Sequence, residues 1–413
     1  MTSTWIGSAE AAARLGVKAQ TLYAYTSRGL LHPRRAVDGR TSRYRSAEVD
    51  ELARRGRPGG RPARAGTVDV RITTALTELT GAGPSYRGRL AADLAGTAPF
   101  EQVAQWLWTG ADGPVAGAEW APRLAPTPGP GVPTLDALVA RCVAAGQADP
   151  DRADRRLDAA VVATRHLIGD LVAAVPARRT RPADGVAATL FARLAGRAAR
   201  PGERTVVDGA LVLLADHDIA SSTLAARVAA STRADVYHVV LAGLATVSGP
   251  LHGVASTLAY RLLREVGARR DARAVVDDRL GLGERLPGFG HRIYAGADPR
   301  YGALVGLLRR SDADAARLAV VDETVAAAAA RVGTFANIDL ALAAMAWCLD
   351  LPPTAGECVF AIARTAGWVA HALEEYGERA VRYRPQAAYI GPRSAAAPVH
   401  QPGPRSSAPP ARS

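Results

Sequence analysis

The feature that most constrains the fold is a stretch in which neither a helix nor a strand is favoured. Residues 54–64 read Arg-Arg-Gly-Arg-Pro-Gly-Gly-Arg-Pro-Ala-Arg. Because proline lacks a backbone donor, glycine is conformationally free and the arginines repel one another, this stretch is expected to be a flexible basic linker.

The chain has 413 residues, and at roughly 150 residues per domain we expect two or three domains. The predicted parts are a module over 1–56, a linker over 57–67, a body over 68–390 and a disordered tail over 391–413.

The net charge of +12 is concentrated at and before this linker. Residues 1–64 carry 13 Arg and Lys against 5 Asp and Glu, a net charge of +8, which leaves +4 for the other 349 residues. A basic module attached to a near-neutral body is typical of a protein with a polyanionic partner.

The first domain contains the pattern of two short helices joined by a tight turn. Ser8 is a predicted N-cap for a helix over 9–15, with Gly16 as its stop, and a second helix is predicted over 18–28, with Gly29 ending it. This is the helix-turn-helix pattern, in which the second helix enters the major groove of DNA.

A small wing is predicted to follow these helices. Residues 30–35 and 41–45 flank Asp38 and Gly39, a sequence typical of a hairpin turn. Ser46 is the predicted N-cap of a third helix, because acidic residues follow it in the first turn.

The motifs Leu-Gly-Val at 15–17, Gly-Leu-Leu at 29–31 and Ser-Arg-Tyr-Arg-Ser at 42–46 resemble the N-terminal winged helix of MerR-type regulators. The resemblance implies DNA binding by a dimer, since one module alone would bind weakly. The expected contacts are, to base edges, Gln20, Thr21 and Tyr25, and to phosphates, Arg34, Arg35, Arg40, Arg43 and Arg45. A helical module that binds protein, or nothing, is the alternative.

The body is predicted to be all-α. Aromatic residues make up only 5% of the chain, and alanine runs such as Val325–Ala330 favour helices. Apolar residues recur at helical spacing from Ala91 onward, and no βαβ alternation with a Gly-x-Gly-x-x-Gly turn is present. The longest uncharged stretch, 236–260, has His238 and His252 in its interior, so we expect buried core and no membrane span.

The three cysteines are Cys142, Cys348 and Cys358. They form no Cys-x-x-Cys pair and have no histidine at metal-ligand spacing, so neither a disulfide framework nor a metal site is expected. With no recognisable signal peptide, this pattern indicates the cytoplasm.

Three of the eight histidines lie where a helix ends or the chain turns. His217 lies in Leu-Ala-Asp-His-Asp at 214–218, His252 in Gly-Pro-Leu-His-Gly at 249–253 and His291 in Pro-Gly-Phe-Gly-His-Arg at 287–292. A single histidine of this kind is more often a core or capping residue. Three of them, together with Asp-Pro-Arg at 298–300 and Asn-Ile-Asp at 337–339, indicate a functional site.

These segments resemble the signature segments of citrate synthases, and so do several others in the same order along residues 68–391. The further matches are Tyr-Arg-Gly at 86–88, Trp-Leu-Trp-Thr-Gly at 106–110, Ser-Thr at 222–223, Ala-Arg-Thr-Ala-Gly-Trp at 363–368 and Arg-Pro at 384–385. The resemblance implies an all-α, two-domain helical body with a small subdomain at about 262–360, the active site between the two domains, and a homodimer. It implies acetyl-CoA and oxaloacetate as substrates, citrate and CoA as products, and neither a cofactor nor a metal.

The resemblance also assigns roles to individual residues. Asp339 is the implied base that removes a methyl proton, His252 donates to the thioester oxygen, and His291 polarises the keto carbonyl. The implied ligands of the oxaloacetate carboxylates are His217, Arg300, Arg364 and, from the second subunit, Arg384.

Four departures from the family pattern leave the substrate open. They are Ala220, Ser256, Ala295 and the run Leu-Ala-Leu-Ala at 340–343. A 2-methylcitrate synthase using propionyl-CoA is one alternative, since one methylene is worth only about 1–3 kcal/mol of discrimination. The other is a DNA-binding regulator whose synthase-like body senses a keto acid or CoA.

Overall fold

The computed structural model divides the chain into two compact units, Met1–Ile72 and Thr73–Ser413. The residues it describes are 5–15, 17, 21–22, 25–26, 31–35, 41–46, 48–50, 71–112, 117–127, 131, 134–177, 184–249, 252–383 and 385. The predicted linker, the predicted tail and three predicted contact residues, Gln20, Arg40 and Arg384, lie outside them.

The first unit combines a three-stranded sheet with short helical segments. Strands β1 (Trp5–Gly7), β2 (Arg34–Arg35) and β3 (Ser42–Arg45) form an antiparallel sheet in the order β1-β3-β2. Helix α1 spans Ser8–Leu15, and residues 21–22, 25–26, 46 and 48–50 are helical. The antiparallel pairing of β2 with β3 confirms the two predicted strands of the hairpin, and the predicted turn at Asp38 and Gly39 lies outside the described residues. Strand β1 was not predicted, because a strand of three residues carries no alternation to detect.

Two sequence-based expectations in this unit need correction. Tyr25 is only 2% exposed and lies in a core with Leu22, Leu31 and Tyr44, so its side chain is not available to a base edge. Ser8 is the first residue of α1, and its hydroxyl donates to the carbonyl of Ser42 at 3.2 Å, which ties the helix to β3 instead of capping it.

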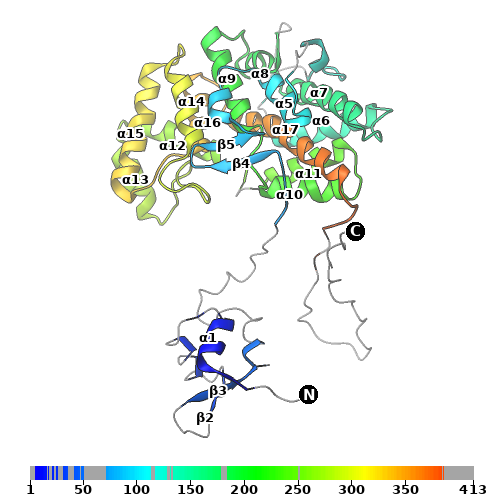
Figure 1. The fold of residues 1–413 in the computed structure, drawn as a ribbon. Helices are drawn as coiled ribbons and strands as arrows, with labels where there is room; N and C mark the ends of the chain where they lie inside the picture. The colour runs from blue at the N-terminus through cyan, green and yellow to red at the C-terminus, as the bar shows by residue number, and fades with distance from the viewer. Residues whose placement is uncertain are drawn as a thin grey trace, which may run out of the picture. The chain divides into compact units, whose positions relative to one another are not determined.

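The second unit is built mainly from helices (Figure 1). They are α4 (Ala91–Leu94), α5 (Phe100–Thr109), η1 (Gly117–Trp120), α6 (Leu135–Ala148), α7 (Leu157–Ala174), α8 (Val186–Ala195), α9 (Pro201–Leu214), α10 (Ser221–Ser231), α11 (Val236–Val247), α12 (Ala255–Arg269), α13 (Ala272–Gly281), α14 (Pro299–Arg309), α15 (Ala315–Val332), α16 (Ile338–Cys348) and α17 (Ala355–Gly377). The run Val325–Ala330 lies in α15, as its composition indicates.

A small antiparallel sheet that the sequence pattern did not predict precedes these helices. It consists of β4 (Thr77–Thr80), β5 (Gly83–Tyr86) and β6 (Arg89–Leu90) in that order. Gly83 has a φ of +108° at the turn between β4 and β5, a conformation that suits glycine alone. The Tyr86 hydroxyl donates to the carbonyls of Val212 and Asp216. These bonds attach the sheet to the segment 214–218, which carries His217.

Helix α17 runs through the middle of the second unit and packs against α5, α9, α10 and α11 (Figure 1). Glycines allow two of these approaches. A Cβ on Gly243 of α11 would lie 2.4 Å from the Trp368 ring, and one on Gly367 would lie 2.4 Å from the Ala215 carbonyl and from the Asp216 carboxylate. The segment that carries His217 is therefore held against the surface of α17.

Helices α12 to α16 form a group that packs on the rest of the unit, α14 and α16 against α9, and α12 and α16 against α17 (Figure 1). Two small apolar clusters lie within the group, one around Leu262 and Val275 and one around Val276 and Ala328. The stretch 236–260 is divided between α11 and α12, and among the described residues no helix is long and apolar enough to cross a membrane.

Candidate active site

His217 and His291 come together although they lie on separate segments. Their ring centroids are 5.6 Å apart in an edge-to-face arrangement. Nε2 of His217 lies 2.9 Å from the Tyr294 hydroxyl, and the Tyr294 ring lies 4.8 Å from that of His291. Burial, together with the cations Arg300 and Arg364, lowers the pKa of His217 well below its usual range, so this ring is neutral.

The tautomer of His291 follows from its backbone contacts. The N–H groups of Ile293 and Tyr294 donate to Nδ1 at 3.1 and 3.3 Å, so the neutral ring carries its proton on Nε2. Burial and the nearby Arg300 charge lower the pKa of His291, which keeps this form. Nη2 of Arg300 lies 3.3 Å from Nε2, and because both atoms are donors, the pair is suited to one shared oxygen acceptor.

Asp298 fixes Arg300 and joins two helix starts. Its carboxylate caps α14 by accepting a hydrogen bond from the backbone N–H of Arg300. It also accepts hydrogen bonds from Nε and Nη2 of the Arg300 guanidinium, at 3.0 and 2.9 Å. The same carboxylate accepts the N–H of Ile338, the first residue of α16, at 3.0 Å. The guanidinium and the beginning of α16 are thereby held by one side chain.

Asp339 lies in the first turn of α16. The Asn337 side chain caps this helix by accepting the N–H of Asp339 and donates to the Gly290 carbonyl at 2.7 Å, which ties Asp339 to the His291 loop. Loss of solvent raises the pKa of Asp339 to about 6; Arg300 opposes this rise, and Asp298 adds to it. No hydrogen bond or ion pair to the Asp339 carboxylate is formed within the described part of the chain.

His252 and Arg364 meet through Phe360. The His252 ring packs edge-on against Phe360 at 5.8 Å, and the Arg364 guanidinium lies 4.6 Å from the same ring. Nε2 of His252 is 3.0 Å from the Ser222 hydroxyl, and Nε of Arg364 donates to the Leu214 carbonyl. Burial, with the Arg364 charge, lowers the pKa of His252, so this ring is also neutral.

Six of the body residues selected from the sequence are described by the structure, and they fall into two linked sets. One set contains His217, His291, Arg300 and Asp339, and the other contains His252 and Arg364. The two sets are linked because the positive charge of Arg364 helps to lower the pKa of His217. Sequence reasoning did not select five residues that position them, which are Ser222, Tyr294, Asp298, Asn337 and Phe360. Ser222, Asp298 and Asn337 lie within the matched motifs, and Tyr294 follows the His291 motif by two residues.

The predicted DNA contacts belong to the other unit. Arg34, Arg43 and Arg45 are exposed on β2 and β3, Arg35 belongs to β2, and Thr21 is helical and partly buried. Throughout the described ranges, no group of three or more His, Cys, Asp or Glu side chains is arranged to hold a metal ion.

All four departures can be located, and the run 340–343 lies buried in α16. Ala220 is the N-cap of α10 and supplies no capping side chain, and Ala295 is exposed. Ser256 is buried with its hydroxyl unpaired, and a Cβ on Gly356 would come within 2.8 Å of that hydroxyl. The Ser256 position therefore has little room for a larger side chain.

Comparison with known proteins identifies both units. The family model for the citrate synthase C-terminal domain matches residues 66–386, and a helix-turn-helix domain model matches residues 5–57. The citrate synthase of Saccharolobus solfataricus is 33% identical over 223 residues, which cover 52% of this chain and 59% of the relative. That of Synechocystis is 36% identical over 197 residues, 46% of this chain and 49% of the relative, so the chain spans about half the length of the curated relatives it matches.

The fold comparison agrees with these matches. The citrate synthase of Pyrobaculum aerophilum superimposes with a TM-score of 0.65 at 26% identity, covering 78% of this chain and 91% of that structure. The Thermoplasma acidophilum enzyme, solved with carboxymethyl-CoA and oxaloacetate, shares the fold at 23% identity, with a TM-score of 0.62 and coverage of 79% and 95%. With a family model covering most of its length, the chain belongs to the citrate synthase family and carries a helix-turn-helix domain ahead of the family's domain.

Proposed function

We propose that this protein condenses acetyl-CoA with oxaloacetate and water to give citrate and CoA, as an acyltransferase that converts the acyl group on transfer. The observation that carries the proposal is the relation between Asp339 and its surroundings. An unpaired carboxylate with a pKa of about 6 is joined through Asp298 and Asn337 to a histidine and an arginine that present adjacent donors. A base with a pKa near the operating pH combines the correct protonation state with a useful driving force.

In the first step, Asp339 takes a proton from the methyl group of the thioester, and the developing enol oxygen requires a donor. Neutral His252 supplies an N–H to that oxygen, because its lowered pKa keeps the ring uncharged at neutral pH. Phe360, which packs on His252, limits the positions available to the imidazole.

In the second step, the enol carbon attacks the keto carbonyl. The Nε2–H of His291 donates to the carbonyl oxygen, and Arg300 lies beside it to stabilise the alkoxide that forms. His217, Arg300 and Arg364 bind the carboxylates of the keto acid, and bidentate arginine contacts fix the reacting face. Arg384, from the second subunit of a homodimer, completes this set by family resemblance. Water then cleaves the citryl thioester to release CoA.

Free thiol release by the full chain tests the proposal. We expect release to depend on both oxaloacetate and acetyl-CoA and to fall by about 10²–10⁴-fold in Asp339→Asn, because the variant lacks the base and keeps the shape. Oxaloacetate binding by calorimetry is the control and stays close to the wild-type value. If no acyl-CoA gives oxaloacetate-dependent thiol release, the proposal is wrong.

The acyl donor is a separate question, for which we propose acetyl-CoA over propionyl-CoA. The same reaction with propionyl-CoA yields 2-methylcitrate. The measurement is kcat/KM for each donor, and a larger value for propionyl-CoA reverses the assignment.

A DNA-binding role for the first unit is the second candidate. It is supported by the helix-turn-helix match and by the exposed Arg34, Arg43 and Arg45 on neighbouring strands. We expect the full chain to retard genomic DNA fragments in a salt-dependent way, and a chain beginning at Thr67 to lose this retardation. Equal retardation by both chains removes the DNA role and leaves the condensation unaffected.

A further inference from the structure

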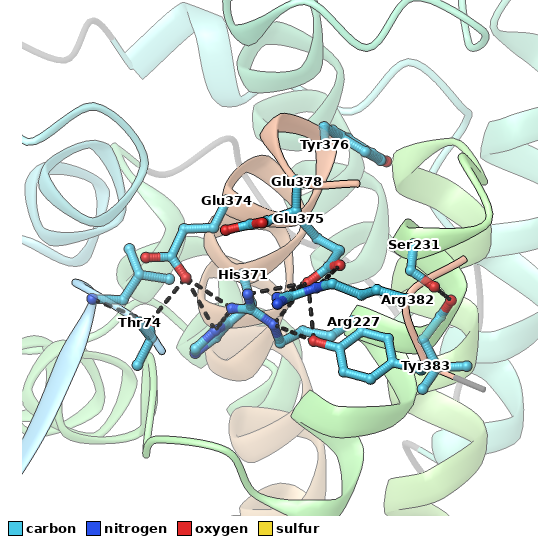
Figure 2. A network of polar contacts seen from close by, with 12 residues as sticks. Thr74, Arg227, Ser231, His371, Glu374, Glu375, Tyr376, Glu378, Arg382 and Tyr383 are labelled. Carbon is cyan, nitrogen blue, oxygen red and sulfur yellow. Dashed lines mark hydrogen bonds and ion pairs between the residues drawn. The ribbon is translucent and has the colours of Figure 1, made fainter. Parts of the chain in front are cut away.

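A buried polar network links α10, α17 and the segment that follows α17 (Figure 2). At its centre Arg227 of α10, 1% exposed, donates from Nη1 to Glu374 at 2.7 Å and from Nε to Glu375 at 3.2 Å. Its Nη1 also lies 2.8 Å from Nδ1 of His371. A fully buried arginine requires this many partners, because an unpaired charge in the interior is strongly unfavourable.

One branch of the network leads to the proposed active site. Arginine can only donate, so Nδ1 of His371 accepts from Arg227 and the ring carries its proton on Nε2. Nε2 lies 3.2 Å from Oδ2 of Asp216, which also accepts the Thr77 hydroxyl at 2.6 Å. Asp216 directly precedes His217, so the chain of contacts ends at the backbone that carries this histidine.

The other branch leads to the residues after α17. Glu375 accepts Nε and Nη2 of Arg382 at 2.6 and 2.8 Å and the Tyr383 hydroxyl at 3.0 Å. Val381 has a φ of +56°, which a β-branched residue rarely adopts, and its N–H donates to the Ser231 carbonyl at 2.8 Å. Such a conformation persists only where the surroundings enforce it, so residues 381–383 are held firmly by α10 and α17.

The composition of the network argues against a purely stabilising role. Replacing buried ion pairs by apolar residues of similar volume is often neutral or stabilising. Here Arg382, Glu375, Arg227, His371 and Asp216 form an unbroken line of polar contacts from residues 381–383 to the backbone of His217, with Glu374 as a further partner of Arg227.

We propose that Arg227, His371 and Glu375 are positioning residues that couple the segment 381–383 to Asp216 and thereby set His217 for keto-acid binding. This inference rests on the proposed function, since His217 is assigned there to the keto acid. None of the three residues is given a contact with substrate, and each acts through Asp216.

The test uses the full-length protein and three variants, Glu375→Gln, Arg227→Gln and Tyr383→Phe. Because His217 faces the keto acid only, we expect Glu375→Gln and Arg227→Gln to raise the Kd and KM for oxaloacetate about tenfold or more while the KM for acetyl-CoA changes less than about twofold. Tyr383→Phe removes one hydroxyl that accepts from Arg227 Nε at 3.2 Å and donates to Glu375, and it is expected to raise the oxaloacetate Kd about two- to fivefold. It keeps the inference testable if the charge variants fail to fold.

The matched control is Glu203→Gln. Glu203 is also buried and accepts both Nη atoms of Arg197 at 2.7 and 2.6 Å, but the pair lies at the start of α9 and is not connected to Asp216. We expect this variant to lower Tm as the network variants do and to leave oxaloacetate binding unchanged.

Three outcomes overturn the inference. If wild-type protein binds and turns over oxaloacetate and the network variants bind it with wild-type affinity, the coupling is absent and the proposed function stands. If a change in oxaloacetate KM appears equally in Glu203→Gln, the effect is general destabilisation. Failure of the wild-type protein to bind oxaloacetate, by calorimetry, overturns the proposed function and this inference together.

Discussion

The raised pKa of Asp339 predicts that removing its charge stabilises the folded protein. The carboxyl pKa is about 6 in the folded chain against a reference of 3.8. A difference of about two units corresponds to about 3 kcal/mol of folding free energy, because each unit is worth about 1.36 kcal/mol. The folded state holds this proton more tightly than the unfolded state does. The contribution of Asp339 is therefore fully present below about pH 4 and is lost as the pH rises through about 6.

Asp339→Asn should consequently unfold at higher urea concentration than the wild type at pH 7.5. Part of the gain is offset, because an ionised residue in the first turn of α16 interacts favourably with the helix dipole by about 0.3–1 kcal/mol. We therefore expect a net gain of about 2 kcal/mol. Tryptophan fluorescence reports the transition, since five of the six tryptophans lie in the second unit.

The control is Asp158→Asn in the exposed first turn of α7, which loses the same dipole interaction without any relief of burial. We expect this variant to be neutral or slightly destabilised, within about 0.5 kcal/mol. The gain in Asp339→Asn should shrink as the pH is lowered from 6 to 4, where the wild-type carboxyl becomes protonated. A variant no more stable than the wild type at pH 7.5, or a gain that is independent of pH, would refute the reasoning.

Three further predictions concern the pH profile, the subunit interface and the first unit. The kcat/KM for condensation should fall tenfold per pH unit below about pH 6, because the base must be ionised, and a profile that stays flat down to pH 5 contradicts Asp339 as the base. Mixing Asp339→Ala with Arg384→Ala protein under subunit exchange should restore part of the activity that each parent lacks, since one site of a mixed dimer has both residues; no recovery with proven exchange shows that Arg384 does not act across an interface. Arg43→Ala should weaken DNA binding evenly across sequences and reduce the salt slope by about 1, as measured by gel shift at several salt concentrations, and an unchanged slope excludes a phosphate contact.

The fold of the second unit could be predicted from the sequence because its cues are local. Alanine-rich segments such as Val325–Ala330 have a high intrinsic helix propensity, and Asp298 and Asn337 cap helices through their own side chains. Strands β4 to β6 were not predicted, since each has at most four residues and two of the three belong to a tight hairpin with Gly83 at its turn.

The sequence motifs were sufficient to select candidate site residues, but they did not indicate how those residues contact one another. The motifs contain His217, His291, Arg300 and Asp339, and the contact between the two histidines depends on tertiary packing that no spacing rule supplies. Tyr25 shows the converse error, because an aromatic residue on a predicted recognition helix is equally suited to the small core of its own module. The Arg227 network had no sequence signal, since charged residues far apart in the chain are ordinarily expected to be exposed.

The arrangement at Asp298 bears on how this protein tolerates change. The position of Asp339 is set from its N-terminal side, by the Asp298 carboxylate on Ile338 and by the Asn337 cap. The run that departs from the family, 340–343, lies on the other side and is fully enclosed by core residues. Substitutions in the buried part of α16 can therefore change its packing without moving the Asp339 carboxylate. A substitution of Asp298 would disturb the Arg300 guanidinium and the starts of α14 and α16 together.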